Sequence, residues 1–184
     1  PDMVRLADGE PVFVEATIEQ NFKITPQQLA AAITPRTKAI ILCSPSNPTG
    51  SVYSLEELEG LAEVLRQHPE VLVIADEIYE HINYVGKHAS IATLPDMQER
   101  TAIINGVSKA YAMTGWRIGF VAAPLALAKA VNKLQGQYTS GAGSISQKAS
   151  VAAFNGDQTP VEEMRQAFLR RKNLIVRLAK EILG

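Results

Sequence analysis

The stretch Val71-Leu72-Val73-Ile74-Ala75 is a near-continuous apolar run that ends at the polar segment Asp76-Glu77-Ile78-Tyr79. A run of this length, rich in β-branched residues and apolar on both faces, is typical of a strand buried inside a sheet. Similar runs occupy residues 38–42, 101–105 and 118–122, and helical patterns alternate with them. The sequence therefore predicts an α/β fold, a mostly parallel sheet sandwiched by helices.

Two capping boxes indicate where helices begin. Thr25 is followed by Pro26 and Gln28, and Ser54 is followed by Glu57, which predicts helices over residues 25–33 and 54–65. Elsewhere the patterns predict a short strand at residues 11–15, helices at 125–135 and 144–154, and a long amphipathic helix from residue 161 onward. We expect Trp116 to pack in the core.

The composition is that of an ordinary globular protein, with 184 residues of which 46% are hydrophobic and 20% charged. The net charge of −1 gives no attraction to nucleic acid or to anionic lipid. The single Cys43 favours a reducing compartment, and we expect the cytoplasm. The three histidines show no metal-ligand spacing, so no metal is expected. Because the chain opens at Pro1 and closes inside a helical pattern, we expect it to be a piece of a longer polypeptide.

Polar motifs follow the predicted strands at the edge where ligands bind in open parallel sheets. They supply an amine, a carboxylate, an amide, a phenol, and a cation with a hydroxyl, from Lys109, Asp76, Asn47, Tyr79, Arg117 and Ser108. A pyridine aldehyde cofactor needs such a set: an amine for its aldehyde, a carboxylate for its ring nitrogen, donors for its ring oxygen, and a cation and hydroxyls for its phosphate.

The chain resembles the fold-type-I pyridoxal-5′-phosphate (PLP) enzymes, and among them the class I aminotransferases related to aspartate aminotransferase. The resemblance rests on residues 46–50, residues 75–79 and above all residues 108–119, where Lys109 precedes Arg117 by eight positions. It implies that Lys109 forms the Schiff base and moves a proton, and that Asp76 pairs with the pyridine nitrogen. It also implies that Asn47 and Tyr79 bind the ring oxygen, with the Asn47–Pro48 bond often cis, and that Ser108 and Arg117 bind phosphate.

By this resemblance, residues 1–157 belong to the PLP-binding large domain, and residues 158–184 form a long helix that leads toward a missing C-terminal small domain. The expected reaction moves an amino group between an amino acid, aspartate first, and a 2-oxo acid, 2-oxoglutarate, in a homodimer. The 184-residue piece itself is expected to be inactive, because the substrate-binding arginine of the family would lie outside it.

Two alternatives remain open at this stage. Another fold-type-I PLP enzyme, of the carbon–sulfur lyase or cyclopropane-carboxylate synthase type, shares the same lysine motif. An aminotransferase-like effector domain of a transcription regulator would share it without being an enzyme, and would require a DNA-binding domain upstream.

Overall fold

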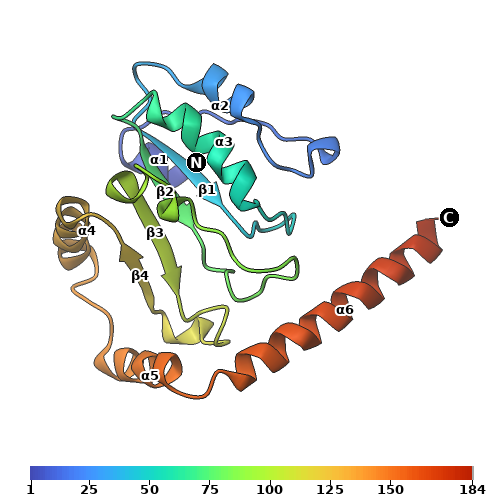
Figure 1. Ribbon diagram of the computed structural model, residues 1–184. Helices are drawn as coiled ribbons and strands as arrows, with labels where there is room; N and C mark the ends of the chain where they lie inside the picture. Colours follow the sequence, from blue (N-terminus) through green and yellow to red (C-terminus); the bar gives the residue numbers. More distant parts are fainter. Residues whose placement is uncertain (184) are drawn as a thin grey trace.

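The computed structural model describes residues 1–183 and contains one four-stranded sheet (Figure 1). Its strands lie in the order β1-β2-β3-β4, with bounds Ala39–Cys43, Leu72–Asp76, Thr101–Gly106 and Gly119–Ala122. Strand β1 pairs with β2 and β2 pairs with β3 in parallel, whereas β3 pairs with β4 antiparallel. The predicted α/β fold with a mostly parallel sheet is therefore confirmed.

The helices begin where their capping residues predict. Thr25 caps α2 (Pro26–Ala32) and Ser54 caps α3 (Leu55–Arg66), and each helix has the complete capping box. The other helices are α1 (Asp2–Leu6), α4 (Leu125–Tyr138), α5 (Ser144–Asn155) and α6 (Thr159–Leu183). Short 3-10 turns lie at Ile18–Gln20, Ile91–Thr93, Gln98–Arg100 and Thr114–Trp116.

Two local predictions were wrong. Residues 11–15 form no strand, and Val12 and Phe13 are each 70% exposed. An extended segment becomes a strand only when its N–H and C=O groups pair with a neighbour, and this segment has no such partner within residues 1–183. Trp116 is not in the core either: it closes the 3-10 turn before β4 and is 44% exposed.

Helices α2 and α3 pack against each other and cover one face of the sheet. Their leucines, among them Leu58 and Leu61, form one buried cluster with Val73 and Ala75 of β2. Because side chains alternate along a strand, Leu72, Ile74 and Asp76 lie on the opposite face. Large apolar side chains on that face are only partly covered within the described residues: Ile41 is 63% exposed, and Leu72 and Ile104 are each 38% exposed.

Helix α6 extends away from the sheet as a single long helix (Figure 1). Near its start, Arg165 donates a hydrogen bond to the carbonyl of Asn83 at 3.1 Å. Farther along, Ile175 is 68% exposed and Ile182 is 83% exposed. The long amphipathic helix is thus confirmed, and most of its apolar side has no cover among the described residues.

Arg100 links the end of α3 to the start of β2. Its side chain is buried, and its guanidinium donates hydrogen bonds to the backbone carbonyls of Leu65, His68 and Val71. The carbonyls of Leu65 and His68 also accept backbone hydrogen bonds, from the N–H groups of His68 and Val71. The guanidinium therefore adds a buried, charged donor where α3 leads into β2.

We expect Arg100→Met to lower the free energy of unfolding by about 2–4 kcal/mol, because the variant removes the buried charged donor that three backbone carbonyls share, and a hydrogen bond to a charged group contributes about 1.5–3 kcal/mol. Urea denaturation measures the effect. Arg36→Met is the matched control, since Arg36 only approaches Glu10 at 3.7 Å and both side chains are exposed. Equal losses in the two variants would contradict this role of Arg100.

Candidate active site at the carboxyl edge of the sheet

Strand pairing places the predicted site residues at one edge. Cys43 pairs with Asp76, and Asp76 pairs with Ile104, so the carboxyl ends of β1, β2 and β3 lie side by side. Asn47, Tyr79 and Lys109 stand in the segments that follow these three ends.

Arg117 reaches the same edge because β4 is antiparallel. Gly106 at the end of β3 pairs with Gly119 at the start of β4, so the residues just before β4 lie beside those just after β3. A Cβ atom on Gly106 would meet the Ile118 carbonyl oxygen at 2.6 Å, so only glycine allows this close approach.

Asn47 and Tyr79 are in direct contact. The Nδ2 amide of Asn47 donates a hydrogen bond to the Tyr79 hydroxyl at 3.3 Å, although the two residues come from different loops. Asn47 is exposed and Tyr79 is half-buried. The Ser44–Pro45 and Asn47–Pro48 bonds are both cis, and the second agrees with the expectation from the resemblance. Two polar groups therefore meet above the ends of β1 and β2.

Lys109 lies over the ring of Tyr79. Its Nζ atom is 5.5 Å from the ring centroid, within the range of a cation–π contact. Lys109 is half-buried and forms no salt bridge with any other residue in the described part of the chain. With no carboxylate bound to it among the described residues, the Lys109 side chain is placed to meet a ligand at this edge.

Asp76 is the last residue of β2 and lies on the more exposed face of the sheet. Its Oδ1 atom accepts a hydrogen bond from the backbone N–H of Ile78 at 3.2 Å, which fixes the carboxylate at the strand end. Beside it, burial raises the pKa of the Cys43 thiol; a hydrogen bond with the Asn47 backbone opposes this rise, and the negative charge of Asp76 adds to it.

Ser108 and Arg117 are joined by the turn between β3 and β4. The Thr114 hydroxyl donates to the Ser108 carbonyl at 2.9 Å, and the Arg117 guanidinium donates to the Thr114 carbonyl at 2.9 Å. Arg117 has a φ of 55° and Ala112 a φ of 52°, both in the left-handed region that costs a non-glycine residue about 1 kcal/mol or more. The turn thus holds a strained backbone that brings a hydroxyl and a guanidinium to the same edge.

The donor set fits a phosphorylated pyridine aldehyde. The amine, the carboxylate, the phenol with its amide partner, and the hydroxyl with its guanidinium all lie beyond one edge of the sheet. Direct contacts join Asn47 to Tyr79 and Tyr79 to Lys109, while strand register alone brings Asp76 to the same edge. The individual roles of these residues stay predictions.

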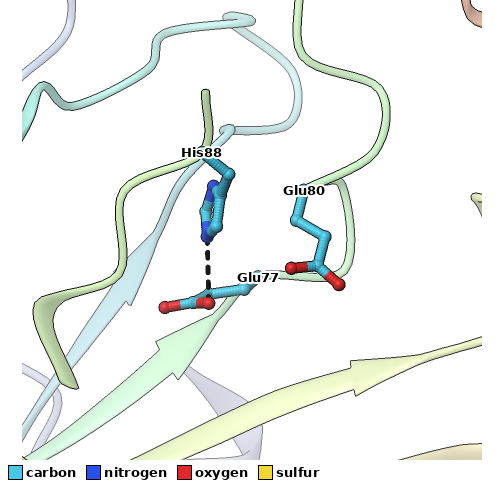
Figure 2. A group of neighbouring side chains, drawn as sticks. All are labelled: Glu77, Glu80 and His88. Carbon is cyan, nitrogen blue, oxygen red and sulfur yellow. Dashed lines mark hydrogen bonds and ion pairs between the residues drawn. The ribbon is translucent and has the colours of Figure 1, made fainter. Parts of the chain in front are cut away.

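Sequence reasoning missed a polar cluster beside this edge, formed by the buried Glu77 and the half-buried Glu80 and His88 (Figure 2). The potential ligand atoms of these side chains lie within 4.8 Å of one another. The sequence carried a signal for it. Glu77 directly follows β2, and its N–H continues the pairing with β3 by bonding to the Ile104 carbonyl. If the alternation of β2 continues by this one residue, Glu77 points toward the covered face and requires a buried partner.

Comparison with known proteins agrees with this geometry. Residues 1–183 match the family described as aminotransferase class I and II. The aspartate aminotransferase of Geobacillus stearothermophilus is 53% identical over 186 residues, and the aspartate/prephenate aminotransferase of Nitrosomonas europaea is 48% identical over 186 residues. Each match covers 100% of this chain and 47% of the relative.

Solved structures give the same result. The aspartate aminotransferase of Rhizobium meliloti superposes with a TM-score of 0.93 at 46% identity, over 96% of this chain and 44% of that one. The fold is shared with the aminotransferases, a family of enzymes that use PLP as their cofactor. The chain belongs to the class I and II aminotransferases, and it spans about half the length of the relatives that it matches.

Proposed function

We propose that the protein is a PLP-dependent aminotransferase that moves the amino group of aspartate to 2-oxoglutarate. The single observation that carries the proposal is the contact series from Asn47 to Tyr79 to Lys109 at the carboxyl edge, beside the strand end that presents Asp76. Aspartate is supported by the names of the relatives at about half identity.

PLP, when bound, supplies an aldehyde for the amino group and an aromatic ring that accepts electrons from the substrate carbon. Lys109 would hold the cofactor through its amine and would move the proton at the substrate carbon. Asp76 would pair with the ring nitrogen and favour its protonated form. Tyr79 and Asn47 would donate hydrogen bonds to the ring oxygen, and Ser108 and Arg117 would bind the phosphate.

The test is borohydride reduction of the protein after loading with PLP, followed by peptide mass mapping. We expect a pyridoxyl adduct on Lys109. An adduct on another lysine, with Lys109 unmodified, would refute the proposed centre. Assays with a panel of amino acids then separate transamination from carbon–sulfur lyase or cyclopropane-carboxylate synthase activity. If the protein turns over none of these substrates, the result favours the effector domain of a transcription regulator.

The 2-oxo acid acceptor deserves its own assay. The relative from Nitrosomonas europaea is named an aspartate/prephenate aminotransferase, so prephenate is a second candidate acceptor beside 2-oxoglutarate. A comparison of kcat/KM for the two acceptors, with aspartate as the donor, decides between them.

The proposal extends to the organisation of the protein. Residues 1–157 would form part of the PLP-binding large domain, and residues 158–184 would lead toward a second, smaller domain. The exposed apolar residues along α6 support this division. A homodimer in the cytoplasm, with small-molecule substrates and no nucleic-acid or membrane partner, completes the proposal. Within residues 1–183, none of the helices combines the length and apolar character that crossing a membrane requires.

A further inference from the structure

A buried carboxylate, that of Glu77, anchors the start of the turn that carries Tyr79. Glu77 is only 6% exposed, and its backbone N–H donates to the Ile104 carbonyl at 3.0 Å, which continues the pairing of β2 with β3. Its side chain turns the other way, and its Oε2 atom lies 2.9 Å from Nε2 of His88 (Figure 2). Glu77 thus joins the sheet to the far end of the loop that follows β2.

A second hydrogen bond, to Glu80, anchors the same turn just after Tyr79. The Nδ2 amide of Asn105, a buried residue of β3, donates to Oε1 of Glu80 at 2.9 Å. Within the turn, the Glu80 N–H donates to the Glu77 carbonyl at 2.9 Å. Tyr79 therefore stands between two carboxylates, each with a fixed partner.

In the described residues the carboxylates of the cluster have protein partners, whereas the buried Nδ1 atom of His88 has none. Glu77 is paired with His88, and Glu80 is paired with Asn105 and approached by His81 at 3.2 Å. Every carboxylate in the cluster has a protein partner, which is the arrangement of a structural tie.

We propose that Glu77 is a positioning residue, which through His88 holds the Tyr79 hydroxyl where Asn47 and the cofactor meet it. The inference rests on the proposed function, because the cofactor is the group that Tyr79 would serve. The tyrosine hydroxyl lies at the end of a long side chain, so a small tilt of the turn moves it by much more than the backbone. A hydrogen bond of 3.3 Å to Asn47 does not survive such a movement.

The test compares four variants of the PLP-loaded protein, in its full length, by pH titration of the absorbance of the bound cofactor. They are Glu77→Met, which removes the acceptor at similar size, Glu77→Gln, which keeps an oxygen for His88, Tyr79→Phe, and the double variant Glu77→Met/Tyr79→Phe. Glu63→Met is the matched control, because Glu63 is an exposed glutamate of α3. Thermal unfolding is recorded for each protein.

We expect Tyr79→Phe to raise the titration midpoint by about one pH unit, because a lost hydrogen bond to the ring oxygen is of that order. Glu77→Met should reproduce at least about half of this shift and weaken PLP binding by roughly tenfold, while Glu77→Gln and Glu63→Met stay near the unsubstituted protein. In the double variant the midpoint should equal that of Tyr79→Phe alone, because Glu77 acts through Tyr79.

Two results would overturn the inference: a normal midpoint in Glu77→Met, or a shift in the double variant equal to the sum of the single shifts. A loss of thermal stability without a change of midpoint gives Glu77 a purely structural role and overturns it as well. If Glu77→Met fails to fold, His88→Phe removes the same Glu77–His88 contact by changing its other partner. Its titration midpoint is then interpreted in the same way. Failure of the proposed function is separate, since it shows as the absence of a pyridoxyl adduct on Lys109 in the unsubstituted protein.

Discussion

Asp76→Ala is expected to slow steady-state transamination by about 10²- to 10³-fold, the range seen when one preorganised electrostatic partner of a reacting group is removed. The carboxylate ends β2 on the face opposite to the α3 leucines, and its register neighbours are Cys43 and Ile104. Without it, nothing at this strand end stabilises a protonated ring nitrogen, and the ring becomes a weaker electron acceptor.

Glu77→Ala is the comparison, and it should cost about tenfold or less, since the Glu77 side chain is buried against His88 and affects the cofactor only through the turn. Asp76→Asn separates charge from shape, because an amide oxygen can still accept the 3.2 Å hydrogen bond from Ile78. We expect Asp76→Asn to resemble Asp76→Ala. Equal rates for the Asp76→Ala and Glu77→Ala proteins would show that Asp76 is not the partner of the ring.

The sheet and its helices could be predicted because local and global preferences agree. Residues 71–75 are β-branched and apolar on both faces, which suits a central strand, and Thr25 and Ser54 satisfy the first N–H groups of their helices. The candidate site residues Asn47, Asp76 and Lys109 were predicted to lie at one edge from one rule, that ligands bind beyond the carboxyl ends of parallel strands.

Features that depend on distant partners could not be predicted. Residues 11–15 form no strand because no neighbouring strand pairs with them among the described residues. Strand β4 runs antiparallel to β3, and this direction is what brings Arg117 to the edge of the site. The pairing of Glu77 with His88 joins residues that are far apart in the loop, and neither residue alone indicates the other. The exposure of Trp116 likewise depends on where its turn lies relative to the sheet.

The 184 residues by themselves are expected to transaminate at less than about one hundredth of the rate of the Geobacillus stearothermophilus aspartate aminotransferase, which is about twice as long. Lys109, Asp76 and Arg117 are all present, so an aldehyde can still be captured. By the resemblance to the family, however, the arginine that binds the substrate carboxylate lies outside these residues. Catalysis needs the substrate held with its breaking bond aligned to the cofactor ring, and here nothing enforces that geometry.

The exposed apolar surface also predicts that the purified chain associates with itself. Ile41 on the sheet and Ile175 and Ile182 on α6 are 63%, 68% and 83% exposed, so the purified chain should self-associate, as size-exclusion chromatography with light scattering would show. The activity assay uses saturating PLP, aspartate and 2-oxoglutarate, with the Geobacillus enzyme as the positive control. Comparable turnover from the two proteins would mean that the groups that orient the substrate lie within these 184 residues. The substrate-binding arginine could then no longer be assigned to another part of the protein.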